Sequence, residues 1–143
     1  MKPYPEEWAE LLDKVNATVN AMPYTSDSKR FGVPDGTGPW TDMKDGTGDC
    51  KAFAIEKLNE LFVIGYPIEA LRLATCELPY DMNINSPRGG HLVLVCATPE
   101  GMDCVLSQGI SYPMRLTQFL ARGFRPLSIQ PRGGVPEMVE WSV

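Results

Sequence analysis

This chain of 143 residues has very little histidine and no closely spaced cysteines. It contains one histidine, His91, and four cysteines, and no two cysteines have the Cys-x-x-Cys spacing of zinc-binding proteins. A closed zinc site would have to collect most or all of its ligands from scattered elements of the fold. We therefore expect no metal site, and we expect the cysteines to be free thiols in a reducing compartment.

Long hydrophobic runs are also absent. No stretch approaches the ~18 apolar residues that a membrane-spanning helix needs. The first residues, MKPYPEEWAE, lack the apolar core of a secretory signal. These absences predict a cytoplasmic protein that has no contact with a membrane.

Positive charge is in short supply as well. The chain has 13 Lys and Arg against 18 Asp and Glu, a formal net charge of −5, whereas nucleic-acid-binding domains usually carry a basic surface. Nucleic acid is therefore not an expected partner. The segment between Cys104 and Pro136 is an exception, because it has four arginines and no acidic residue. It is either a solvated face or a docking patch for an acidic partner.

Hydrophobic periodicity predicts helices first and strands after them. The expected elements are helices at about 6–22 and 50–64, strands at about 70–78, 91–98 and 102–108, a short helix at 112–123 and a last strand at 124–130. The strands at 91–98 and 102–108 should form a hairpin. This order predicts a single α+β domain over residues 1–143 with an antiparallel sheet, in which 131–143 is an extended tail.

A cysteine stands at the start of the second predicted helix. The stretch DGTGDCKAFAIEKLNELF places Cys50 directly after a glycine-rich turn, at the end of a long loop over residues 23–48. Unpaired backbone N–H groups at a helix start favour a thiolate and can also stabilise an oxyanion. Cys50 is therefore a candidate nucleophile, and the alternative is a buried thiol that packs as a small apolar residue.

His91 begins an apolar strand and is the candidate base, because a nucleophilic thiol needs an imidazole within hydrogen-bond reach. The next strand should supply the residue that orients the ring. Side chains alternate along a strand, so Asp103 and Ser107 share one face. If His91 lies opposite Ser107, the hairpin is centred on Pro99. Ser107 is then the expected orienting residue and Gln108 the next candidate, whereas Asp103 lies too near the turn.

Several stretches match one family when they are taken together. They are VNATVNAMPYTSD, FGVPDGTGPWT, GTGDCKAFAIEKL, LRLATCEL, HLVLV and VLSQ, within roughly residues 14–110. They resemble the bacterial transglutaminase-like cysteine proteases, a family that includes a periplasmic protease that releases biofilm adhesins by cutting near a double alanine. The resemblance implies a papain-like core in which Cys50 is the nucleophile and His91 the base. Trp40 resembles a family tryptophan that would line the cleft, although an ordinary packing role fits it equally.

The resemblance also bears on calcium and on the source of the chain. Family members usually have two acidic residues straight after the cysteine, which take part in calcium binding. Here these positions hold Lys51 and Ala52, and only Asp49 keeps the acidic character. Because calcium prefers several oxygen ligands, we expect no calcium at this place and no other cofactor. The missing secretory signal separates the chain from periplasmic relatives and indicates a bacterial cytoplasm or a phage, so an adhesin substrate is not assumed.

The third catalytic residue of the family, an aspartate in a Leu-Asp-Asn run, corresponds to Ser107 in a Leu-Ser-Gln run. A serine hydroxyl can orient the ring but cannot neutralise an imidazolium. Papain-like enzymes, however, use a neutral asparagine in this role. We therefore expect a cysteine-dependent peptidase of weakened activity, acting on a protein or peptide substrate. The alternatives are an amide transferase of transglutaminase type and a binding protein that keeps the fold without catalysis.

Overall fold

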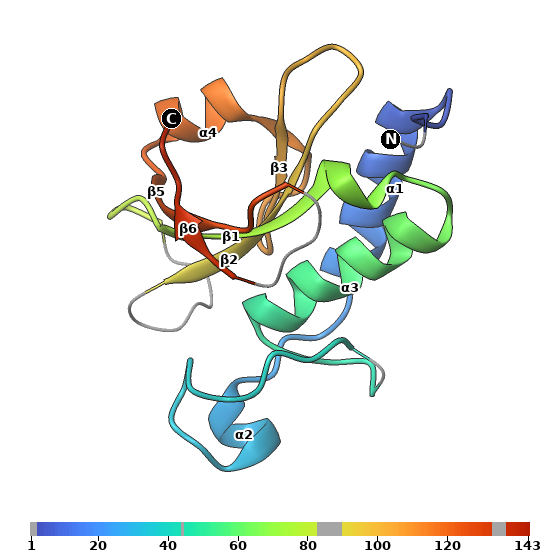
Figure 1. The fold of residues 1–143 in the computed structure, drawn as a ribbon. Coiled ribbons are helices and arrows are strands. Elements are labelled where there is room, and N and C mark those ends of the chain that lie inside the picture. Colours follow the sequence, from blue (N-terminus) through green and yellow to red (C-terminus); the bar gives the residue numbers. More distant parts are fainter. Residues whose placement is uncertain (1–2, 44, 83–89, 133–136) are drawn as a thin grey trace.

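A computed structural model of the chain describes residues 3–43, 45–82, 90–132 and 137–143. Within these residues, helices pack on an antiparallel sheet of six strands (Figure 1). The elements are α1 (Trp8–Asn20), α2 (Asp27–Phe31), α3 (Cys50–Val63), a 3-10 helix η1 (Ile68–Ala70), β1 (Leu71–Glu77), β2 (His91–Cys96), β3 (Cys104–Leu106), β4 (Met114–Arg115), α4 (Leu116–Arg122), β5 (Arg125–Ile129) and β6 (Val139–Glu140). The predicted α+β architecture is confirmed.

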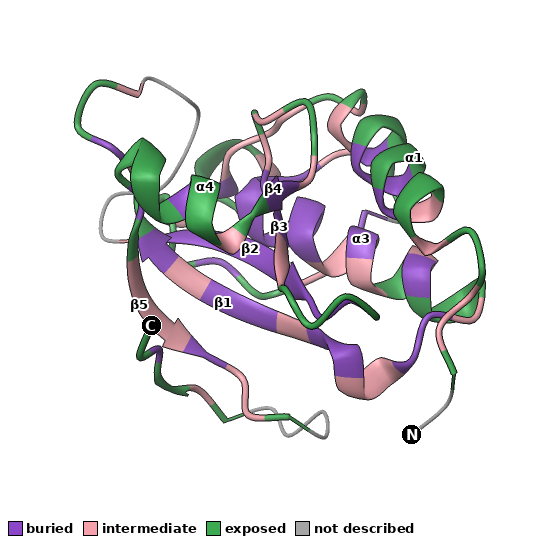
Figure 2. Ribbon diagram, turned by 90° about the horizontal axis from the view of Figure 1, so that it is seen from above, coloured by how far each residue is buried: buried purple, intermediate pink, exposed green. Residues whose placement is uncertain are grey.

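The strands follow the order β4-β3-β2-β1-β5-β6, so β2 lies inside the sheet and every one of its residues is buried (Figure 2). On one face of β2, Leu92 and Leu94 pack in the core that contains α1 and α3. On the other face, Val93 and Val95 pack with Phe119 of α4. Because side chains alternate along a strand, the sheet separates two hydrophobic cores.

The helix that carries Cys50 has clear local causes. Asp49 is its N-cap, and the Asp49 Oδ1 accepts hydrogen bonds from the backbone N–H groups of Lys51 and Ala52 at 3.1 and 3.4 Å. Such a cap satisfies donors that have no partner inside the helix. The helix ends before Gly65, whose φ of +106° suits glycine. Both ends are therefore encoded in the adjacent sequence.

The loop expected over residues 23–48 contains a helix that the sequence analysis missed. Ser26 caps α2, and Gly32 ends it in a left-handed conformation. Five residues are too few to show a periodic apolar pattern, so the capping residues are the available sequence signal. Most of the loop that we expected before His91 lies outside the described residues, which resume at Gly90.

The end of the chain contributes more to the core than an extended tail would. Val139–Glu140 forms β6 and pairs with β5. Trp141 is buried, and its ring centroid lies 5.7 Å from that of Phe119. The two-residue strand is too short to stand out in the sequence among its prolines and glycines. No helix among the described residues has the length and apolar character to cross a membrane.

Candidate active site

Cys50 is the first residue of α3 and is fully buried. The turn before it passes very close to the helix, because a Cβ on Gly48 would lie 2.3 Å from the Ala52 Cβ. Only glycine fits there without displacement of one of the two segments. The Gly-Asp-Cys sequence thus provides the close turn, the helix cap and the candidate nucleophile in three consecutive residues.

His91 and Ser107 meet through a buried hydrogen bond of 2.8 Å between the histidine Nε2 and the serine Oγ. The Ser107 hydroxyl also donates to the carbonyl of Gln108 at 3.2 Å. Since a hydroxyl has one hydrogen to donate, its oxygen accepts the Nε2–H of His91. This network places a proton on Nε2, so that in the neutral ring Nδ1 carries the lone pair and can accept a proton.

The predicted hairpin register was wrong by one step. The structure pairs Cys96 with Cys104, so the hairpin is centred on Glu100 instead of Pro99. The cause is the turn, in which the Gly101 N–H donates to the Thr98 carbonyl at 3.1 Å and Gly101 adopts a φ of +79°. A sequence pattern cannot locate this turn to a single residue, because strand alternation alone fits either centre.

The corrected register still brings the two side chains together. Its continuation past Leu106 places Ser107 opposite Val93, on the same face as His91 but one diagonal step away. Diagonal neighbours in an antiparallel pair lie about 7–8 Å apart, within reach of a long side chain. The imidazole of His91 spans this gap. Asp103 pairs instead with Arg72 at 3.4 Å.

Cys50 and His91 lie near the same point of the sheet. His91 is the cross-strand partner of Cys76 in β1. Burial is the largest cause that raises the pKa of Cys76 to about 12, and the electrostatic interaction with Cys50 is the second largest. The elements that carry Cys50 and His91, α3 and β2, pack against each other. The electrostatic effect of Cys50 on Cys76 indicates that the start of α3 lies toward the end of the sheet at which His91 begins β2.

Burial keeps the imidazole neutral. Burial and, as a smaller cause, the positive charge of Lys57 together lower the pKa of His91 to about 4. Ser107 has no charge with which to oppose this effect. At neutral pH, His91 is therefore a proton acceptor.

A buried ion cluster lies beside Cys50 and was not predicted. The Lys51 ammonium bonds to Asp27 Oδ2 at 2.7 Å and also to the Asp49 carboxylate. Burial alone would raise the pKa of Asp27, but hydrogen bonds from Lys51 and from the backbone outweigh it and lower that pKa. Burial alone would lower the pKa of Lys51, but the carboxylates of Asp27 and Asp49 outweigh burial and raise that pKa. The cluster ties α2 to the first turn of α3.

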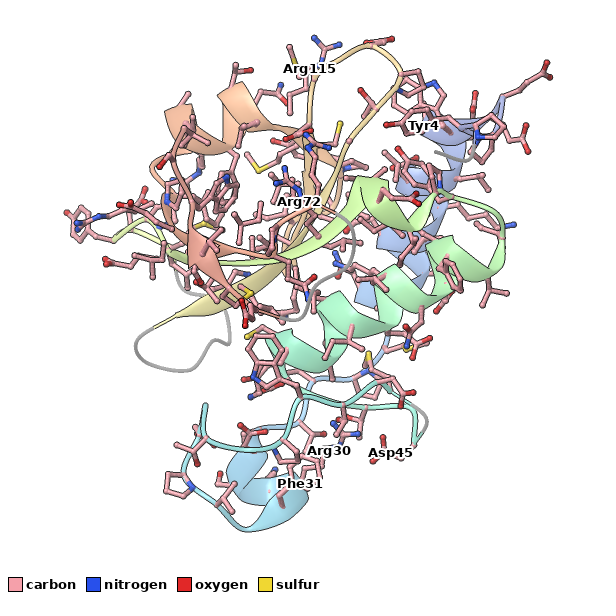
Figure 3. The ribbon with its side chains drawn as sticks, in the orientation of Figure 1. Tyr4, Arg30, Phe31, Asp45, Arg72 and Arg115 are labelled. Atoms are coloured by element: carbon pink, nitrogen blue, oxygen red, sulfur yellow. The ribbon has the colours of Figure 1, made fainter. Side chains whose placement is uncertain are left out.

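The loop between α2 and Cys50 is held by Arg30. Its guanidinium makes two bonds to Asp45, at 2.9 and 3.2 Å, and one to Thr41 Oγ1 at 2.9 Å. Figure 3 shows Arg30 projecting toward Asp45 beside the loop, with Phe31 next to it. This clamp fixes the approach of the chain to the Gly-Asp-Cys turn.

The two remaining candidates, Trp40 and Gln108, have different surroundings. Trp40 is in the loop and 47% exposed, so it is not a core residue, and its role in a cleft stays a prediction. Gln108 contributes its backbone carbonyl to Ser107, while its side-chain oxygen is buried without a hydrogen-bond partner in the described part of the chain.

Comparisons place this geometry among known proteins. Residues 1–111 match the family model of the bacterial transglutaminase-like cysteine proteinases. The chain is similar to calcium-bound LapG of Legionella pneumophila, with 25% identity and a TM-score of 0.70 over 96% of this chain and 71% of LapG. A second LapG structure has 27% identity and a TM-score of 0.65 over 92% of this chain and 67% of LapG. No curated protein matches.

One sequence-based expectation is contradicted by these comparisons. We excluded calcium because Lys51 and Ala52 replace acidic residues, yet one of the similar structures is calcium-bound. Two substitutions were therefore too little to exclude this ion.

The family match covers more than half of the chain, and the helix that begins at Cys50 packs on an antiparallel sheet as in LapG. The chain belongs to the bacterial transglutaminase-like cysteine proteinase family and is a cysteine peptidase.

Proposed function

We propose that this peptidase cuts a protein or peptide substrate with Cys50 as nucleophile, His91 as general base and Ser107 as the orienting group. The observation that carries the proposal is the buried 2.8 Å bond between His91 Nε2 and Ser107 Oγ. It lies on a sheet that packs against a helix beginning with cysteine. A nucleophile, a base and an orienting group are the parts that thiol peptidases share.

The proposed reaction begins when Nδ1 of His91 takes the Cys50 proton and the sulfur attacks the substrate carbonyl carbon. We assign the oxyanion to backbone N–H groups near Cys50, at the start of α3. The C–N bond then breaks, and the leaving amine takes the proton from His91. Water, activated by His91, hydrolyses the thioester and restores the thiol.

Access to the nucleophile requires local opening. Cys50 and His91 are 0% exposed and Ser107 is 1% exposed, so a peptide carbonyl cannot reach the sulfur in this conformation. Small reagents should therefore react with Cys50 faster than bulky ones of the same chemistry.

Thiol labelling tests the proposed nucleophile. We expect iodoacetamide at neutral pH to modify Cys50 before the other cysteines, because burial raises the pKa of Cys76, Cys96 and Cys104. Peptide mass spectrometry resolves the four sites. His91→Ala should slow labelling at Cys50 alone. If Cys50 reacts no faster than the half-buried Cys104 and is indifferent to His91, the proposal fails and the fold is better explained as a binding module.

Hydrolysis and amide transfer share the same acyl-enzyme and differ in the group that resolves it. We propose hydrolysis, and a labelled primary amine provides the test. Once a peptide substrate has been found in a peptide library, mass spectrometry of its products distinguishes a free carboxylate from an amide. Predominant amide would overturn hydrolysis while leaving Cys50 as nucleophile.

Calcium binding is a separate question that calcium-bound LapG raises for this chain. The carboxylates of Asp27 and Asp49 face the Lys51 ammonium, so a calcium ion at this place would compete with that ammonium for the same oxygen ligands. Calorimetric titration with CaCl₂ should show tighter binding to Lys51→Glu than to the parent if the ammonium and calcium compete for this place. Equal binding would place any calcium ion elsewhere.

We also propose that the enzyme meets its substrate in a reducing compartment such as the cytoplasm. All four cysteines are free thiols, including Cys96 and Cys104, which face each other across the hairpin. Thiol counting in whole cells under trapping conditions tests this proposal, and recovery of a disulfide-linked form would contradict it.

A further inference from the structure

A tight turn follows directly after β3 and begins at Ser107. The Ile110 N–H donates to the Ser107 carbonyl at 3.1 Å, and Gly109 adopts a φ of +88°. A hydrogen bond between the first and fourth residues is typical of a β-turn, and glycine suits a positive φ at the third. The turn therefore fixes the backbone that carries the orienting hydroxyl.

The same turn places a carbonyl beside the Ser107 hydroxyl. Gln108, the second residue of the turn, accepts the hydroxyl hydrogen on its backbone oxygen at 3.2 Å. Because a hydroxyl has one hydrogen to donate, its oxygen is left to accept the Nε2–H of His91 at 2.8 Å. The partner of one ring nitrogen sets the tautomer of a histidine, so the position of the Gln108 carbonyl determines which nitrogen carries the hydrogen.

Asn20, the last residue of α1, holds both ends of this turn. Its side-chain Nδ2 donates to the Ser107 carbonyl at 3.1 Å and to the Ile110 carbonyl at 2.9 Å. Asn16 is fully buried and donates to the same Ile110 carbonyl at 3.0 Å. Residues four positions apart share one face of a helix, so α1 presents two side-chain amides to one turn.

The partners of Asn20 also fix the orientation of its amide. The two hydrogens on Nδ2 match the two carbonyls, whereas a reversed amide would set its oxygen against two acceptor oxygens. The amide oxygen Oδ1 is buried without a hydrogen-bond partner among the described residues. Asn20 therefore keeps its two donor bonds to the turn although its own acceptor is unsatisfied.

We propose that Asn20 is a positioning residue for the proposed catalytic site: by holding the turn at 107–110, it fixes the direction in which the Ser107 hydroxyl donates and so keeps the His91 ring in the tautomer with its hydrogen on Nε2. This inference rests on the proposed function, in which Nδ1 of the ring takes the thiol proton. The chain of contacts runs from Asn20 to the Ser107 carbonyl, and from the Ser107 hydroxyl to the ring.

A displaced turn would release this arrangement. Once the Gln108 carbonyl moves away, the Ser107 hydroxyl can rotate and donate its hydrogen to Nε2, which favours the ring with its hydrogen on Nδ1. In that tautomer Nδ1 has no lone pair with which to take the thiol proton. A wrong tautomer likewise accounts for the loss of turnover when a serine protease has asparagine in place of its orienting aspartate.

The single histidine makes the test direct, because isotopically labelled histidine reports on the ring nitrogens of His91 alone. Protonated and unprotonated ring nitrogens have different NMR chemical shifts, which give the ratio of the two tautomers. We would measure this ratio at neutral pH in the Cys50→Ala protein, with and without Asn20→Ala or Asn20→Asp. Asn20→Asp keeps the shape of the side chain and removes the donor hydrogens.

The Cys50→Ala protein should carry the ring hydrogen predominantly on Nε2. Both changes at Asn20 should shift the tautomer ratio toward Nδ1 by roughly two- to tenfold, the range expected for the loss of one neutral hydrogen bond. Val19→Ala is the matched control, since it removes buried packing from the same helix but no hydrogen bond. It should lower stability and leave the tautomer ratio unchanged. Circular dichroism checks that each variant is folded.

A folded Asn20→Ala protein with an unchanged tautomer ratio would overturn the proposal, because Asn20 would then be a structural contact only. A further change at Ser107 tests the route. In Ser107→Ala, the additional Asn20→Ala change should have no effect on the ratio, and a persistent effect would show that Asn20 does not act through the hydroxyl.

The Cys50→Ala protein also supplies a measurement that needs no change at Asn20. If its ring carries the hydrogen mainly on Nδ1, the proposal is wrong even when no Asn20 variant folds. Because the nucleophile is absent from all these proteins, the outcome is independent of catalysis. Failure of Cys50 labelling would instead refute the proposed function and leave the effect of Asn20 on the ring intact.

Discussion

At the scale of single residues, the site is built around one imidazole that the fold keeps neutral. His91 is buried, bonded to the uncharged Ser107 and affected by the charge of Lys57. Burial and the charge of Lys57 disfavour the imidazolium that forms when the thiol gives up its proton, and the Ser107 hydroxyl has no charge with which to stabilise it. The weakened catalysis expected from serine in place of aspartate thus has a physical cause in the ring's surroundings.

Ser107→Asp should reverse part of this effect. A carboxylate bonded to Nε2–H favours the charged ring, so the His91 pKa should rise by roughly one unit or more and Cys50 labelling should accelerate. NMR of the single histidine and labelling kinetics measure the two results. Ser111→Asp on the exposed loop is the control. An unchanged His91 pKa in Ser107→Asp would show that the serine does not tune the ring.

His91 should also make the stability of the protein depend on pH. Its pKa falls from 6.5 to about 4 on folding, so between these values the unfolded chain binds a proton that the folded chain does not. The contribution is complete above about pH 6.5 and is lost toward about pH 4, by roughly 3 kcal/mol at most. Urea unfolding between these limits should show a smaller loss in His91→Gln. Equal losses in the two proteins would contradict the assignment.

At the scale of elements, the start of α3 is held from two sides. Asp49 caps the helix, and Lys51 joins it to Asp27 of α2. These bonds anchor the loop before α3. Without them, the turn that leads into Cys50 would be only weakly constrained. Arg30 adds a second anchor farther along the same loop.

Lys51→Met should destabilise the protein strongly. It leaves the buried carboxylates of Asp27 and Asp49 without their counter-ion, and the loss of one partner from a buried pair costs about 3–5 kcal/mol. Urea unfolding at pH 7 measures the change, with the exposed Lys29→Met as control. The defect should shrink at acidic pH, where Asp27 becomes protonated once the ammonium that lowers its pKa is gone. A defect of the same size at both pH values would argue against the charge explanation.

At the scale of the whole molecule, the sheet has a core on each face, and the end of the chain completes one of them. α1 and α3 cover the face that carries the nucleophile helix, while α4 and Trp141 cover the other. The sheet that carries His91 and Ser107 therefore depends for its closure on residues late in the sequence.

Trp141→Ala should lower the free energy of unfolding by about 3–5 kcal/mol, the usual range for a buried tryptophan. Trp141 is 7% exposed, whereas Trp40 is 47% exposed. Trp40→Ala should therefore have little effect on stability, and any effect it has should appear in turnover of a peptide substrate. Thermal and urea unfolding compare the two variants. Equal stability losses would show that the end of the chain is not part of the core.

Local patterns in the sequence determined the elements and the candidate chemistry. The apolar spacing of α1 and α3, the Asp49 cap and the alternation of the strands all act over a few residues. Cys50, His91 and Ser107 could therefore be chosen from their positions at element ends. The short elements α2 and β6 were not predicted, because they have too few residues to show a periodic pattern.

Contacts between distant residues were decided by the tertiary structure alone. The turn at Gly101 set the hairpin register, and packing of α3 on β2 buried Lys57. The Lys51 ammonium found Asp27, which is 24 residues away. Helix and strand periods specify the face on which a side chain lies. They contain no information about which charged residue lies on the element that packs against that face. That partner decides whether a buried charge is neutralised, as the Lys51 ammonium is by Asp27 and Asp49.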